Sequence, residues 1–82
     1  PLAWTVWRGQ RLRVGGAQLG LDSGPPGQVL SAGPPGIEVA CGAGSLLLTQ
    51  VQPEGGRMLP AREFLAGRKL VAGEQLEAPT PG

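Results

Sequence analysis

The sequence predicts a mainly β protein: a small antiparallel barrel of five to six strands with one short helix near the C-terminus. Its 82 residues suit a single domain, expected over residues 1–77, with residues 78–82 as a disordered tail. Fifteen glycines and nine prolines supply the many tight turns that a small barrel needs. Short runs of alternating apolar and polar residues, joined by brief connections, indicate strands. Together these observations favour a barrel of the OB-like kind.

The first half of the chain contains three expected strands. In the second of them, Leu12 and Val14 share one face. Arg11 and Arg13 share the opposite face, because side chains alternate along a strand. The glycine pair that follows, at positions 15–16, suggests a bulge or a bend at a barrel corner. The three expected strands are residues 4–7, 11–18 and 28–32.

A hairpin is the most specific feature of the second half. Ile37, Val39 and Cys41 share one face of its first strand, so Cys41 is expected to be a buried, inert thiol. Ala43 stands between two glycines, which reach the positive φ angles that a tight turn demands. The two strands of the hairpin are expected over residues 37–41 and 45–52.

One short helix is expected after the hairpin. Pro60 suits its first turn, and Gly67 suits the position just past its end. Phe64 and Leu65 are expected to pack the helix against the barrel. The helix is predicted over residues 60–66, and a last extended segment over residues 70–76.

Composition excludes several kinds of site. With no histidine and one cysteine, the chain lacks the commonest general base, and a zinc site is implausible. A lone cysteine cannot form an internal disulfide, which fits a reducing cytosol. No run approaches the roughly 20 apolar residues that a membrane span needs. The chain has no initiator methionine, so we expect it to be a piece of a longer protein. We predict no catalytic residue, metal, membrane contact or cofactor for this domain.

Several motifs occur together in a specific order. Residues 36–44 read Gly-Ile-Glu-Val-Ala-Cys-Gly-Ala-Gly, and residues 55–58 read Gly-Gly-Arg-Met. A short Ala-Arg-Glu-Phe-Leu segment follows at residues 61–65. With this combination the chain resembles the C-terminal domain of methionyl-tRNA formyltransferase over nearly its whole length. Two positions depart from the pattern of that family: Ala43 stands where Asp is common, and Gly56 replaces a frequent first lysine of a basic pair.

The resemblance implies an accessory role in a larger enzyme. In that family an N-terminal catalytic domain, with an Asn-His-Asp set, transfers a formyl group from 10-formyltetrahydrofolate to the amino group of initiator methionyl-tRNA. That catalytic domain and its folate are expected outside this chain. The barrel is expected to hold the acceptor arm of the tRNA through phosphate contacts that set its register. The full-length protein is expected to be a cytoplasmic enzyme.

The cations gather in two segments, although the net charge is only +1. Residues 1–13 carry three arginines and no acid, and residues 57–69 carry four cations against Glu63 alone. Charge alone favours ordinary solvated arginines, whereas the family resemblance favours phosphate binding. The predicted tRNA-binding residues are Arg57, Arg11 and Arg13, followed by Arg62, Arg68 and Lys69.

Two alternatives stay open at this level. The first is the C-terminal barrel of another formyltransferase or of a formyl-folate hydrolase. The second is a small barrel that docks protein partners through an apolar groove. Trp4 and Trp7 bear on the second, because residues three apart on one strand point to opposite faces. An outward-facing tryptophan in an apolar patch would favour protein docking, and one among arginines would favour RNA.

Overall fold

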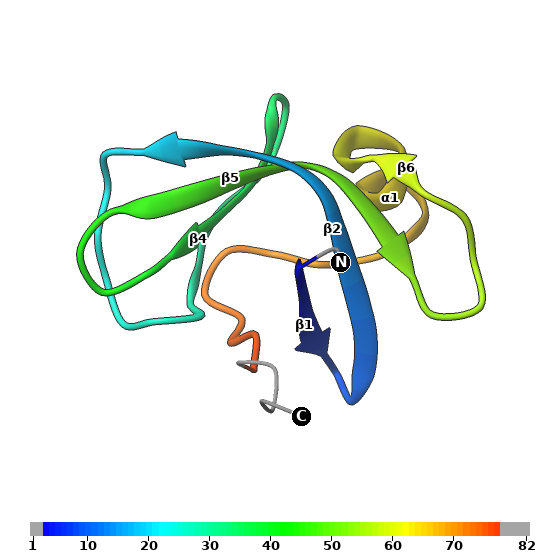
Figure 1. Ribbon diagram of the computed structural model, residues 1–82, viewed down its shortest axis with the longest axis horizontal. Helices are drawn as coiled ribbons and strands as arrows, with labels where there is room; N and C mark the ends of the chain where they lie inside the picture. The colour runs from blue at the N-terminus through cyan, green and yellow to red at the C-terminus, as the bar shows by residue number, and fades with distance from the viewer. Residues whose placement is uncertain (1–2, 78–82) are drawn as a thin grey trace.

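A curled antiparallel sheet forms the centre of the protein, which a computed structural model describes over residues 3–77 (Figure 1). Its strands run in the order β1-β2-β5-β4-β3, and β6 pairs with β5. This half-barrel with one short helix confirms the predicted fold class, and the expected strands are shifted by only one or two residues. The elements are β1 (Ala3–Trp7), β2 (Gln10–Gly20), β3 (Val29–Gly33), β4 (Gly36–Ala40), β5 (Ser45–Pro53), β6 (Leu59–Pro60) and α1 (Ala61–Gly67).

The long strand β2 links the two halves of the sheet. Its first part pairs with β1, and most of its length pairs with β5. The register of β2 against β5 shifts on both sides of Gly16, which confirms the bulge expected at the glycine pair. A bulge bends its strand and increases the local twist, so β2 follows the curl of the sheet.

The β4–β5 hairpin forms as predicted, with Ile37 opposite Leu48. Gly42 and Gly44 adopt φ angles of 89° and 90°, which an L side chain rarely reaches. Cys41 lies outside β4 and is exposed, so the prediction of a buried thiol was wrong. The strand ends at Ala40, and Cys41 already belongs to the turn, where its amide donates to the Gly44 carbonyl. Strand alternation therefore stops one residue before the cysteine.

The core lies between the inner face of the sheet and α1. Phe64 is fully buried, and its ring meets the ring of Trp7 edge-on, with 5.4 Å between centroids. Leu65 packs against the same core from a half-buried position, as predicted for the pair. Gly67 is the last helical residue, not the first residue beyond the helix, because the chain turns directly into an extended conformation at Arg68. The predicted helix end was therefore one residue too early.

Residues 70–77 cross the open side of the curled sheet and join its two edge strands (Figure 1). The Glu77 amide and carbonyl both bond to Val6 of β1. On the other edge, the Val29 amide of β3 donates to the Glu74 carbonyl, and the Gly73 amide donates to the Val29 carbonyl. Within this segment, the Leu76 side chain is buried. The predicted last extended segment is present only in part: residues 72–73 form a turn, and the segment makes two isolated β-bridges, Gln75 with Gln28 and Glu77 with Val6, in place of a continuous strand. It spans the open side of the half-barrel.

Glu74 is the polar centre of this closing segment. Its carboxylate accepts hydrogen bonds from the Val71 amide, the Trp7 indole and the Arg8 guanidinium, with 3.0 Å between Arg8 Nε and Glu74 Oε1. The Val71 amide contributes most to lowering the pKa of Glu74, and Trp7 and Arg8 add to it against the opposing effect of desolvation. The closing segment is thus tied to β1 through an ionised side chain.

The C-terminal tail and a membrane span were also considered in the sequence. The predicted tail at residues 78–82 lies outside the described residues. In residues 3–77 there is no helix long and apolar enough to cross a membrane.

Candidate nucleic-acid interface

Strand β2 places two of the predicted arginines on the outer face of the sheet. Leu12 points inward and is 2% exposed, so Arg11 and Arg13 on either side of it point outward and are exposed. In the ladder, Arg13 lies opposite Trp4 of β1 and opposite Gln52 of β5. The alternation read from the sequence therefore brings two guanidinium groups to one surface.

The tryptophan on this surface supports the arginines. The Arg11 guanidinium lies over the Trp4 ring, 4.6 Å from its centroid, which is the geometry of a cation–π contact. Trp4 is half-buried, whereas Trp7 is buried against Phe64. The two tryptophan side chains thus lie on opposite faces of β1, as their spacing predicts. Because the outer tryptophan lies among arginines, this surface does not match the apolar patch expected of a protein-docking barrel.

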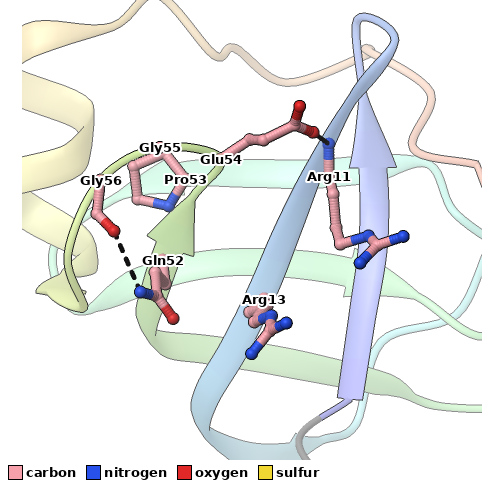
Figure 2. A pocket seen from close by; sticks show the side chains of 7 residues that line it. All are labelled: Arg11, Arg13, Gln52, Pro53, Glu54, Gly55 and Gly56. Carbon is pink, nitrogen blue, oxygen red and sulfur yellow. Dashed lines mark hydrogen bonds between the residues drawn. The ribbon is translucent and has the colours of Figure 1, made fainter.

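A pocket of about 480 Å³ opens beside the two arginines (Figure 2). Its lining is mainly polar and comes from β2, from the end of β5 and from the loop that follows β5. Figure 2 shows the Arg11 and Arg13 side chains on one side, and Gln52 and the loop on the other. The lining residues are Arg11, Arg13, Gln52, Pro53, Glu54, Gly55 and Gly56.

Residues 54–58, the Arg57 loop, are held to the strands by hydrogen bonds. The Gln52 Nε2 group donates to the Gly56 carbonyl at 3.0 Å, and the Gly56 amide donates to the Pro53 carbonyl at 3.0 Å. The Arg11 amide donates to Glu54 Oε1 at 3.0 Å. Gly55 adopts a φ of 78°, so the tight turn at this position favours glycine. The loop therefore has a fixed shape at the edge of the pocket.

Arg57 follows directly after this turn and is exposed. It is not among the residues that line the pocket, but the pocket wall includes its neighbour Gly56. Met58 then returns the chain toward the sheet, and its side chain covers the bulge at Gly15 of β2. Arg57 is thus the residue directly after the part of the loop that lines the pocket of Arg11 and Arg13.

The other three predicted residues belong to α1 and the turn after it. Arg62 is exposed on the helix. The Arg68 guanidinium lies 5.0 Å from the centroid of the Phe64 ring, which it covers. The Lys69 carbonyl accepts a hydrogen bond from Arg8 Nη2 at 2.8 Å. The six candidates therefore form two groups, and only the first of them borders the pocket.

Sequence reasoning missed two contributors to this site, Gln52 and Glu54, and did not say which of the two tryptophans faces the arginines. Gln52 donates a hydrogen bond to the loop, Glu54 adds a carboxylate to the pocket, and the Trp4 ring lies beneath the Arg11 guanidinium. The Gln-Pro pair at the end of a strand was the available signal for Gln52, because proline stops the strand just where a side chain can cap the turn. Nothing in the local sequence indicates the contact of Met58 with Gly15, since they are far apart in the chain.

Within residues 3–77, no group of three or more His, Cys, Asp or Glu side chains could hold a metal ion. Apart from the Glu54 carboxylate, the polar groups of the site are guanidinium, amide and backbone groups on a β surface. Such groups recognise anions with delocalised charge, and arginine is well suited to phosphate because its planar fork can donate two hydrogen bonds. The fold and this surface define the chain as a small half-barrel with two exposed arginines beside a polar pocket on one face.

The sequence comparisons give the family. The sequence profile described as "Formyl transferase, C-terminal domain" matches residues 1–69. The chain belongs to that family. The resemblance predicted from the motifs is therefore confirmed.

Three similar proteins carry the same name. A protein of Myxococcus xanthus named methionyl-tRNA formyltransferase is 53% identical over 75 residues, which is 92% of this chain and 24% of the relative. The protein of that name from Citrifermentans bemidjiense is 48% identical over 89% of this chain and 23% of the relative. The Thiobacillus denitrificans protein is 47% identical over 95% of this chain and 26% of the relative. The chain thus spans about a quarter of the length of these relatives.

Proposed function

We propose that this chain is the tRNA-binding C-terminal domain of a methionyl-tRNA formyltransferase. The proposal is supported by the family match and by the name that the similar proteins share. The observation that carries it is the pocket where Arg11 and Arg13 face a hydrogen-bonded loop, which Arg57 directly follows in the chain. Backbone phosphates are the anions that such a row of separate guanidinium groups would contact.

The domain would act by positioning its substrate. The formyl group would pass from 10-formyltetrahydrofolate to the amino group of initiator methionyl-tRNA in an N-terminal catalytic domain of the same protein. This domain would hold the acceptor arm so that the amino group reaches the folate, which lowers the entropy cost of the reaction. Its partners are thus the initiator tRNA and the catalytic domain, and we propose that the enzyme works in the cytoplasm.

The described residues suggest how each charge takes part. Trp4 restricts the Arg11 guanidinium before RNA arrives, so less side-chain entropy is lost on binding. Arg13 stands between Trp4 and Gln52 in the ladder, at the centre of the surface. The Glu54 carboxylate places a negative charge in the pocket, and one of its oxygens accepts a hydrogen bond from the Arg11 amide. We therefore assign the main phosphate contacts to Arg11, Arg13 and Arg57, and place Arg62, Arg68 and Lys69 second.

A salt series tests the proposal. We expect this chain to bind initiator tRNA at low ionic strength, with an association constant that falls steeply as salt rises. Arg57→Gln should reduce the slope of log K against log salt by about 1, because one phosphate contact is lost. Binding that is absent at low salt, or a slope that Arg57→Gln leaves unchanged, would contradict the assignment. Leu19→Gln, at a side chain that is 89% exposed on the far part of β2, is the control and should leave the slope as it is.

A further inference from the structure

The geometry points to Met58, Gly15 and Gln52 as positioning residues that hold the Arg57 loop in one orientation beside Arg11 and Arg13. None of the three carries a charge, so none contributes to the electrostatic attraction of RNA. Their effect would be to fix where the Arg57 charge stands relative to the two strand arginines. The inference rests on the proposed function, because it concerns how the same surface is presented to tRNA.

The first attachment is a steric fit between Met58 and the β2 bulge. A Cβ atom added to Gly15 would lie 2.5 Å from the Met58 sulfur and 2.6 Å from its terminal methyl carbon. Real Cβ atoms do not approach other atoms so closely, so the methionine occupies the space that a side chain at position 15 would need. The φ of Gly15 lies outside the left-handed region, so a side chain at position 15 would conflict with the place of the Met58 side chain and not with the backbone conformation. The bulge and the methionine therefore form a matched pair.

The second attachment is polar and lies at the other end of the loop. Gln52 donates from its side chain to the Gly56 carbonyl, immediately before Arg57. Glu54 accepts from the Arg11 amide, which joins the loop to the strand that carries the first arginine. Arg57 thus stands between a hydrogen-bonded residue on one side and a packed methionine on the other. Both of its neighbours along the chain are fixed, although Arg57 itself is exposed.

This arrangement has a consequence for binding that differs from the effect of charge. A mobile loop must be ordered when its arginine meets a phosphate, and each immobilised side chain or loop costs conformational entropy. A loop that is already ordered avoids this cost. Loosening it should therefore weaken tRNA binding only through Arg57, while the number of cations stays the same.

A double-mutant cycle in tRNA binding separates the two effects. Met58→Ala should raise the Kd for initiator tRNA by about three- to tenfold in the wild-type background, as expected for the cost of ordering a loop. In an Arg57→Gln background the same change should leave the Kd nearly unchanged, because the loop no longer presents a charge. Equal effects of Met58→Ala in the two backgrounds, or no effect in either, would overturn the inference.

Glycine variants supply a matched comparison. Gly15→Ala should displace the end of the flexible Met58 side chain from β2 and thereby reproduce the loss of affinity expected for Met58→Ala. Gly33→Ala changes another strand glycine whose Cβ would meet nothing within 4 Å, so it should bind tRNA like the wild type. A Gly15→Ala variant that binds as tightly as Gly33→Ala would count against the steric fit.

Hydrogen exchange tests the loop without RNA, so a failure of the proposed function can be told from a failure of this inference. The Gly56 and Arg11 amides both donate hydrogen bonds that depend on the loop conformation. Their exchange should become faster in Met58→Ala and in Gln52→Leu, and should stay slow in Arg57→Gln. Unchanged exchange in the first two variants would refute the positioning role. If the wild type did not bind tRNA but exchange rose as expected, the tRNA assignment would fall and the attachment of the loop would stand.

Discussion

Replacing Phe64 with alanine should remove a large part of the folding stability. Phe64 is fully buried, and its ring meets Trp7 at a centroid distance of 5.4 Å and an interplanar angle of 64°. Truncating a buried phenylalanine costs about 3–5 kcal/mol, and the loss of an edge-on aromatic pair accounts for about 1 kcal/mol of such a cost. A domain of 82 residues has a total stability of roughly 4–12 kcal/mol. Phe64→Ala is therefore expected to lose between about a third and nearly all of the folding stability.

Urea denaturation followed by circular dichroism measures this change. We expect the free energy of unfolding of Phe64→Ala to fall by about 4 kcal/mol, because α1 then loses its anchor in the half-barrel. Leu19→Ala is the control: its side chain is 89% exposed, and its substitution should change stability by less than about 0.5 kcal/mol. A loss below about 1.5 kcal/mol for Phe64→Ala would show that the core is not organised around this ring.

Three further predictions concern closure and exposure. Hydrogen bonds lower the pKa of Glu74 in the folded state. Its ionised carboxylate therefore contributes its full share of folding stability above the pKa of the unfolded state, and this share is lost as the pH falls through the pKa of the folded state. The urea midpoint of the wild type should thus fall more steeply in acid than that of Glu74→Gln, and parallel curves would contradict this. Gly27→Ala should cost about 2 kcal/mol more than Gly9→Ala. Both glycines have positive φ, but only at Gly27 would a Cβ collide with a backbone atom, the Leu76 carbonyl oxygen; equal costs would argue against closure by residues 70–77. Cys41 should react with a thiol reagent in the folded protein about as fast as in urea, whereas protection until unfolding would place it inside the core.

The parts of the fold that follow from local rules were predictable. The glycines around Ala43 indicate a hairpin because only certain residues reach those φ angles, and the glycine pair in β2 indicates the bulge for reasons of local packing. Cys41 shows the limit of this reasoning. Alternation predicts a face only while the strand continues, and no local signal states that it ends at Ala40.

Contacts between residues far apart in the sequence could not be predicted from such local patterns. Glu74 bonds to Trp7 and Arg8, which precede it by more than sixty residues, so its role appears only when the barrel closes. The division of the cations into two groups has the same origin. Arg11 and Arg13 share a pocket with the loop that follows β5, whereas the Arg68 guanidinium lies over Phe64 at the end of the helix. There the Lys69 backbone carbonyl accepts a hydrogen bond from Arg8.

The measurement that tests the central claim most directly compares two charge-matched double variants in tRNA binding. Arg11→Gln with Arg13→Gln removes two positive charges from the pocket, and Arg68→Gln with Lys69→Gln removes two from the helix end. If the β2 surface binds tRNA, the first pair should lower the salt slope by about 2 and the second pair by clearly less. Equal losses of slope and affinity would mean that only total charge matters, and would contradict the assignment of the interface to β2 and the Arg57 loop.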